Sequence, residues 1–122
     1  MTTGTVLRLA DITPVDGPES ALSARICAAI NLMDPTPPLV IVARGDHALL
    51  LPAIALSQRT AHRRVSEYVL IDPDLPTVSD SWPDAPVTVV TDDTDGQASL
   101  QGRLRGWQLL THAMYRTGEA DA

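Results

Sequence analysis

Four residues could move or orient a proton at the ends of predicted strands. Asp46 follows a sharp turn, and His112 lies just beyond the last predicted strand. Asp72 and Asp93 stand at or just after the ends of two further strands. An imidazole exchanges protons near neutral pH, and a nearby carboxylate can orient it. The pattern predicts acid–base chemistry, with Asp46 or His112 as the base and one of the other two acids in support.

Each of these residues also has a structural interpretation. Asp46 could cap the helix that follows the turn, where the helix dipole would stabilise its anion. His112 could lie in a C-terminal loop with no chemical role. His47, which begins the same helix, could line the pocket or be solvated.

The segment 38–55 predicts a buried strand, a sharp turn and an apolar helix. Gly45 stands at the apex of the turn, where glycine tolerates a positive φ, although any tight turn could also use it. Glycine has no side chain that could attack a substrate, and covalent catalysis needs an activated nucleophile. The segment therefore has the geometry of a nucleophile-bearing turn without the nucleophile.

Other candidate residues have simpler expected roles. The segment 73–86 holds four prolines around Trp82, which we expect to be a hydrophobic plug over the pocket or part of an interface. Its acids, Asp74, Asp80 and Asp84, are expected to solvate a loop. Cys27 is the only cysteine and is expected to be a buried helical residue, so no disulfide can form within the chain. No ligand spacing indicates a metal site, and we expect no cofactor.

The elements that position these residues alternate along the chain. Strands are expected at 5–9, 39–43, 68–72, 87–91 and 107–111. Helices are expected from a cap at Asp16 to Met33, from about Asp46 to Arg64, and through Leu100 and Leu104 to a stop at Gly106. The alternation predicts one α/β domain over 1–122, with a reduced, mostly parallel sheet of four or five strands and helices on both faces.

Several short motifs resemble the α/β-hydrolase superfamily. In small bacterial members the turn reads Gly-His-Ser-Gly-Ala-Gly and is followed by Ala-Leu-Leu-Pro-Ala. Here Ala43-Arg-Gly-Asp-His-Ala48 is followed by Leu49-Leu-Leu-Pro-Ala53. Further matches are Tyr68 to Pro76, Ala85-Pro-Val-Thr-Val, Arg105-Gly-Trp and Thr111-His-Ala-Met114.

The resemblance covers most of 17–122 and implies a C-terminal half of such a fold. It places the family's nucleophilic serine at Gly45 and the neighbourhood of its catalytic histidine at His112. It also implies that the N-terminal strands and the loop that supplies an oxyanion-hole N–H are missing. A truncated sheet has a bare edge, so we expect a homodimer or a partner protein to cover it.

Charge and hydropathy exclude several classes of partner. The formal net charge is −6, and no basic run exceeds Arg63-Arg64, so neither nucleic acid nor an anionic membrane is expected. No apolar run approaches the ~18 residues of a membrane span, and the N-terminus does not read as a signal peptide. The expected location is the cytoplasm.

Three functions follow from these features. The first is a small-molecule protein that binds a largely apolar metabolite, without a polyanionic group, and carries out an isomerisation, cyclisation or elimination. The second is a non-catalytic binding or interaction module with a vestigial pocket. The third, which the loss of the serine disfavours, is an ester hydrolase that uses an unorthodox base. The sequence favours the first.

Overall fold

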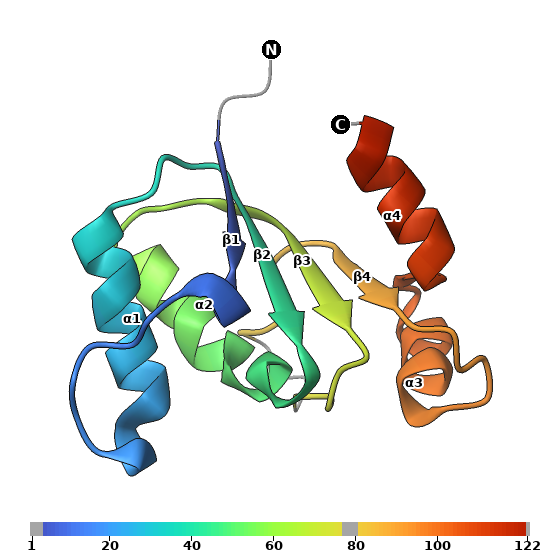
Figure 1. Cartoon of the computed structure of the whole chain (residues 1–122), viewed down its shortest axis with the longest axis horizontal. Helices are drawn as coiled ribbons and strands as arrows, with labels where there is room; N and C mark the ends of the chain where they lie inside the picture. The colour runs from blue at the N-terminus through green and yellow to red at the C-terminus, as the bar shows by residue number, and fades with distance from the viewer. Residues whose placement is uncertain (1–3, 77–80, 122) are drawn as a thin grey trace.

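The computed structural model describes residues 4–76 and 81–121, with side chains to residue 116, and shows a five-stranded parallel sheet (Figure 1). The strands lie side by side in chain order. They are β1 (Thr5–Arg8), β2 (Leu39–Arg44), β3 (Val65–Ile71), β4 (Val87–Val90) and β5 (Gln108–Leu110). The prediction of an α/β fold with a reduced parallel sheet and flanking helices is confirmed.

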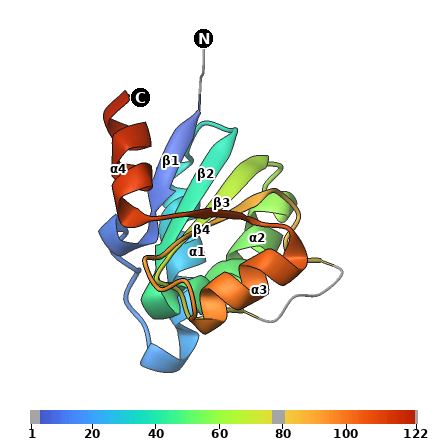
Figure 2. The same cartoon turned by 90° about the vertical axis from the view of Figure 1, so that its right-hand side faces the viewer.

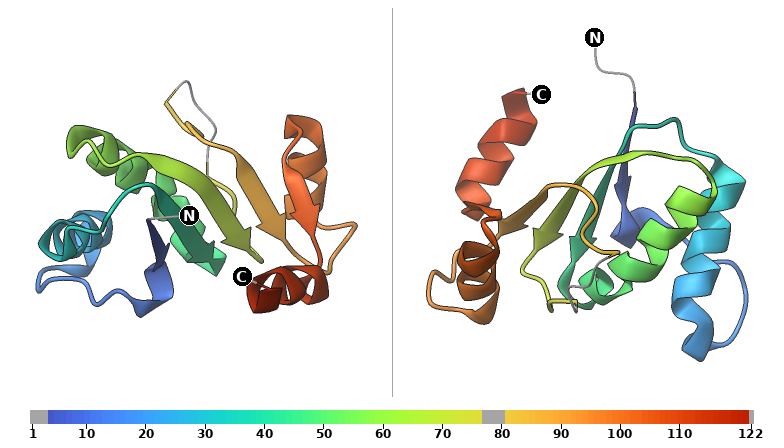
Figure 3. Two further views of the ribbon diagram at one scale, coloured as in Figure 1. Left: turned by 90° about the horizontal axis from the view of Figure 1, so that it is seen from above. Right: turned by 180° about the vertical axis from the view of Figure 1, so that it is seen from behind.

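Three of the four α-helices cover one face of the sheet. Figures 2 and 3 show α1, α2 and α3 on that face and α4 on the other. Right-handed crossovers between parallel strands that succeed one another in space bring every connection to the same face. The helices are α1 (Leu22–Met33), α2 (Leu51–Thr60), α3 (Gln97–Arg105) and α4 (His112–Asp121). Short 3₁₀ helices are η1 (Leu9–Asp11), η2 (Glu19–Ala21) and η3 (Gly45–Leu50). None of the described helices is long and apolar enough to span a membrane.

Alternate residues of the strands build two separate apolar clusters. Ile41 and Tyr68 are register partners and belong to the large cluster beneath the helices. Val42 and Val69, one residue further along, belong to a small cluster on the opposite face, against which Tyr115 of α4 packs. One face is therefore a full core, and the other is only partly covered.

The connection from β3 to β4 contains no helix among its described residues, and Trp82 fills the space there. Trp82 is completely buried, with its ring 5.5 Å from that of Tyr68 and 6.1 Å from that of Trp107, both edge-on. Edge-to-face pairs at such distances are favourable beyond their buried area. This places Trp82 within the core under the helices.

A polar network ties the same connection to the sheet and to α2. The Tyr68 hydroxyl donates to Asp84 at 2.5 Å, and Arg59 donates to the other Asp84 oxygen at 2.7 Å. Burial, and then the bond to Asp84, raises the pKa of Tyr68 well above its usual range. Partial burial opposes ionisation of Asp84, but the bonds from Tyr68 and Arg59 outweigh it and hold the pKa of Asp84 below its ordinary value. The expectation that Asp84 only solvates a loop is wrong.

The expected helix from Asp46 to Arg64 is shorter and divided. Residues 45–50 form η3, because Pro52 has no N–H to donate back to Ala48 and α-helical bonding begins around it. At the other end His62 adopts a φ of 58°, and the N–H of Arg63 bonds the carbonyl of Gln58 at 2.9 Å. This is a Schellman C-cap in which histidine replaces the usual glycine, so the sequence carried no stop signal.

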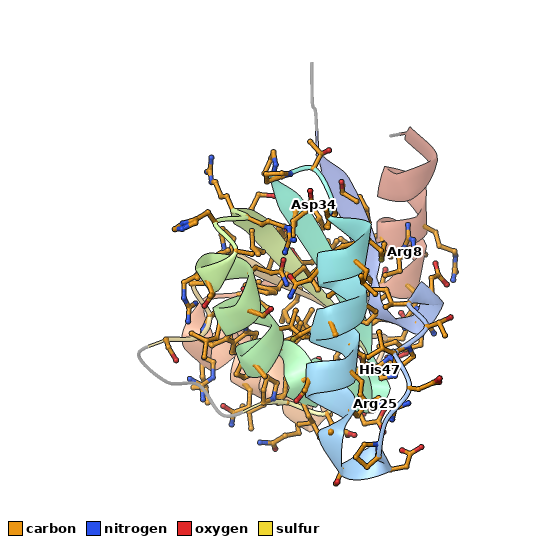
Figure 4. All side chains as sticks on the ribbon, turned by 90° about the vertical axis from the view of Figure 1, so that its left-hand side faces the viewer. Arg8, Arg25, Asp34 and His47 are labelled. Carbon is orange, nitrogen blue, oxygen red and sulfur yellow. The ribbon has the colours of Figure 1, made fainter. Side chains whose placement is uncertain are left out.

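Arg63 lies beyond the end of α2 and is buried, not an exposed cation at the helix end. Its guanidinium donates to Gln58, Asn31 and Asp34 at 3.1, 2.9 and 3.2 Å. Asp34 ends α1 in the left-handed conformation (Figure 4). One arginine thus joins the C-terminal ends of α1 and α2.

Several other sequence expectations need correction. Asp16 does not cap α1, because Pro18 and η2 precede the helix. The apolar spacing placed Met33, Leu100 and Leu104 on the apolar sides of their helices, but all three are exposed, since α1 ends at Met33 and α3 packs through Ser99 and Gly102. A side chain at Gly102 would collide with Leu109, which explains why the small residue faces the sheet. Cys27 is half-buried against the core, and Gly106 ends α3 as expected.

We expect the Asp84→Asn variant to lose stability at pH 7 and to match the native protein more closely at pH 3. A group with a lowered folded pKa stabilises the fold above its unfolded pKa of about 3.9 and loses that contribution as the pH falls. Urea unfolding at both pH values measures the difference. Asp16→Asn, at an exposed acid, is the control, and an equal loss at both pH values would contradict the assignment.

We expect Arg63→Ala to destabilise the protein by about 2 kcal/mol, because Gln58 and Asn31 lose a charged hydrogen-bond donor. Arg64→Ala removes an exposed neighbour of the same charge and should change the free energy of unfolding by less than about 0.5 kcal/mol. Chemical denaturation compares the two variants. Equal changes in the free energy of unfolding would show that the buried network does not contribute to stability.

Candidate functional site

The carboxyl ends of the strands are open on the face that carries α4. A doubly wound sheet opens a crevice where its strand order reverses, but this sheet has no reversal. The opening arises because α1, α2 and α3 all cover the opposite face. The candidate residues that follow β2, β3, β4 and β5 meet at this edge.

His112 and Asp72 form a direct pair there, 40 positions apart in the sequence. His112 Nε2 lies 2.8 Å from Asp72 Oδ2, and the side chains are 22% and 53% exposed. The contact is a hydrogen bond in either charge state of the imidazole and an ion pair only when the imidazole is protonated. One of the two acids expected to orient His112 therefore does so.

Local hydrogen bonds fix both partners. Thr111 caps α4 by accepting the N–H of Met114 at 3.1 Å, so His112 is the first residue of a helix that the sequence did not predict. The His112 N–H donates to Asp92 Oδ1 at 2.9 Å. Asp72 has a φ of 42°, and its N–H continues the sheet by donating to Val90 at 2.9 Å.

The pair determines which imidazole nitrogen is available for chemistry. An ionised carboxylate only accepts hydrogen bonds, so Nε2 carries the proton that Asp72 receives. In the neutral ring Nδ1 then has the free lone pair. Among the described residues Nδ1 has no hydrogen-bond partner. The dyad can accept a proton at Nδ1, and Asp72 stabilises the imidazolium that results.

The other candidate acids do not reach His112. Asp93 builds the turn before α3, where its carboxylate accepts the N–H of Asp95 at 3.2 Å and its carbonyl accepts the Ser99 hydroxyl at 2.6 Å. Asp46 is exposed within η3, five residues before α2 begins, so it does not cap that helix. Asp92 was missed, although its position after β4 parallels that of Asp72 after β3.

The expected binding residues are separated. Gly45 follows β2 with a φ of 59°, and a side chain added there would meet no atom within 4 Å. His47 is half-buried in η3 (Figure 4), and its Nδ1 is buried and without a partner among the described residues. Trp82 lies in the core.

A pocket of about 180 Å³ lies at the end of the strand that leads into Asp72. Its walls are Arg8, Ala10, Asp11, Val42, Arg44 and Ile71. A larger pocket of about 380 Å³ is lined by residues 75–76, by Trp107 and by residues of α3. Neither lining includes His112 or Asp72, but the smaller pocket includes Ile71, which directly precedes Asp72.

Within residues 4–76 and 81–116, no cluster of three or more His, Cys, Asp or Glu side chains could hold a metal ion. Comparisons of the chain with protein-family models, with curated protein sequences and with solved structures found no match. The resemblance to α/β-hydrolases therefore stays a hypothesis carried by the motifs, and the function rests on the geometry at the strand ends.

We expect Asp72→Ala to abolish the slowly exchanging Nε2–H signal of His112 in proton NMR and to cost less than about 1 kcal/mol of stability. The pair is partly exposed, and such pairs contribute little to folding. Asp92→Ala is the matched control, because Asp92 binds the backbone of His112 and leaves the ring contact in place. A signal that survives Asp72→Ala would contradict the pair.

Proposed function

We propose that this chain binds a small, largely apolar molecule at the carboxyl edge of its sheet and moves a proton on it without hydrolysing it. The observation that carries the proposal is the His112–Asp72 contact, which leaves Nδ1 of the imidazole as a proton acceptor. An imidazole can act as a catalytic base at one nitrogen while a carboxylate holds its other nitrogen.

One further feature favours proton transfer over hydrolysis. Gly45 leaves the apex of the turn without a hydroxyl or thiol, which removes the group that would form an acyl intermediate. The dyad is also partly open to solvent, so a proton that it takes up can exchange with water.

The proposed step is a proton transfer with no net redox change. Nδ1 takes a proton from a carbon next to a carbonyl, the C–H electron pair becomes a C=C bond, and the π pair of the carbonyl moves onto its oxygen. If the imidazolium returns the proton to another carbon of this enolate, the result is an isomerisation. If the enolate carbon first bonds to an electrophilic carbon of the same molecule, the proton goes to the electrophile's heteroatom and the result is a cyclisation. If the bond to a group on the next carbon breaks instead, the leaving group takes the proton and the result is an elimination.

The test is hydrogen–deuterium exchange in D₂O with a panel of ketones, aldehydes and 2-oxo acids, followed by proton NMR. We expect exchange at the carbon next to the carbonyl of at least one compound. His112→Ala should reduce its rate to that of buffer, and Asp72→Asn should lower it about 10²-fold. His62→Ala, at an exposed histidine beyond α2, should leave it unchanged.

Exchange that survives His112→Ala would contradict the proposal. A parallel panel of p-nitrophenyl esters, with His112→Ala and Asp46→Ala, tests hydrolysis. We expect no turnover. Turnover that either substitution removes would instead support a hydrolase in which an activated water replaces the serine.

A second candidate is an interaction module, favoured by the outer edge of β1. In the described sheet β1 pairs only with β2, and Val6 on that strand is 55% exposed. An unpaired edge of this kind can add a strand from a second copy or from another protein. If none of the panel exchanges in any variant, this candidate replaces the first.

A further inference from the structure

The pocket beside the dyad has a distinct pattern of charge. Val42 and Ile71 form an apolar floor, and both are almost fully buried. Arg8 and Arg44 stand on the same face of neighbouring strands, because Arg8 pairs with Val42 and Arg44 with Ile71 in the sheet register. Asp11 completes the charged rim, so the lining has one net positive charge.

Arg8 and Arg44 differ in whether their side chains already have interaction partners. Arg8, on the side of the sheet nearest α4 (Figure 4), has an interaction partner of its own. The Arg44 side chain makes no hydrogen bond or ion pair with any described residue, although it borders the cavity. A guanidinium offers a planar fork of donors that matches a carboxylate, so Arg44 is the group free to receive one.

The register places this group within reach of the dyad. Arg44 pairs with Ile71, and Asp72, the partner of His112, follows directly. Neighbouring strands lie about 4.8 Å apart, so a molecule anchored at Arg44 needs to span only about 5–10 Å to approach His112. The volume of about 180 Å³ is below the range of drug-sized ligand sites, which indicates a small molecule.

We propose that this pocket binds a small monocarboxylate, with the carboxylate on Arg44 and a short apolar body on Val42 and Ile71. One net positive charge complements a monoanion, whereas Asp11 would repel a phosphate dianion. This inference rests on the proposed function, since it names the class of molecule on which His112 would act. It also refines the expected apolar metabolite by giving it one anionic end.

The test compares 3-phenylpropionate with 3-phenylpropionamide, its neutral counterpart, by NMR titration of the ¹⁵N-labelled full chain. We expect the carboxylate to bind about tenfold more tightly. Shifts should centre on the Arg44 Nε–H and on the amides of Val42 and Ile71. Equal affinities, or shifts centred on the larger pocket at Trp107, would overturn the assignment.

Substitutions distinguish a specific contact between Arg44 and the carboxylate from a general effect of positive charge. Arg44→Gln should weaken carboxylate binding about tenfold and leave amide binding unchanged, while Arg44→Lys should restore part of the loss. Arg64→Gln, at an exposed arginine outside the pocket, should change neither. An equal loss of carboxylate affinity in Arg64→Gln would overturn the assignment of Arg44 as the anchor. If Arg44→Gln fails to fold, the comparison of the acid with the amide in the native protein still tests the assignment.

The two proposals can fail separately. His112→Ala should bind 3-phenylpropionate as the native protein does, because the histidine is not part of the anchor. Exchange chemistry that depends on His112, without carboxylate binding at Arg44, would overturn only the ligand class. Carboxylate binding without exchange of any compound would retain the pocket and overturn the chemistry.

Discussion

The handedness of the crossovers constrains the rest of this molecule. Five parallel strands in chain order, joined by right-handed connections, send α1, α2 and α3 to one face of the sheet. Among the described elements, α4 lies on the opposite face; it follows the last strand and is not a crossover. A pocket remains on that face at the ends of β1, β2 and β3, with Val42 and Ile71 in its floor and Asp11 of η1 in its wall. His112, the first residue of α4, follows β5 and contacts Asp72 at the end of β3. The position of the site is thus set by the topology of the sheet, and the side chains determine its chemistry.

The connection between β3 and β4 links the stability of the core to the geometry of the site. Trp82 fills the space beneath the other helices, and Asp84 binds both Tyr68 on β3 and Arg59 on α2. The first part of the same connection passes the turn after β2, where the N–H of Asp74 donates to the carbonyl of Gly45 at 3.1 Å. Asp72 begins this connection. The same connection therefore carries both Asp72 of the dyad and Asp84 of the buried network.

Elements that depend on the periodicity of apolar residues were predicted from the sequence. Features that depend on backbone conformation or on hydrogen bonds to backbone groups were missed. Buried strands such as 39–43 and 68–72 were located because parallel strands covered by helices on one face still read as apolar runs. The sequence left Asp72 and Asp93 open as partners of His112, because all three follow strands that end at the same edge; the structure places Asp72 against the ring. The end of α2 was misplaced, since His62 adopts a conformation that usually signals itself through glycine. Asp92 was overlooked because it acts on a backbone N–H, and α4 because its cap, Thr111, falls within the segment predicted to be a strand.

The orientation of His112 gives a physical reason why the site needs no serine at position 45. In an imidazole, Nε2 is the nitrogen farther from the backbone, and here it is committed to Asp72. The nitrogen that remains, Nδ1, lies close to Cβ and has a shorter reach. It can accept a proton from a molecule lying against the sheet but is poorly placed to serve a side chain held out on a separate turn. Gly45, at the apex, has a φ of 59° and open space where a Cβ would stand, and it brings no nucleophile to this edge of the sheet. The glycine and the direction of the histidine ring therefore both fit the proposed chemistry, in which the base acts on the bound molecule itself.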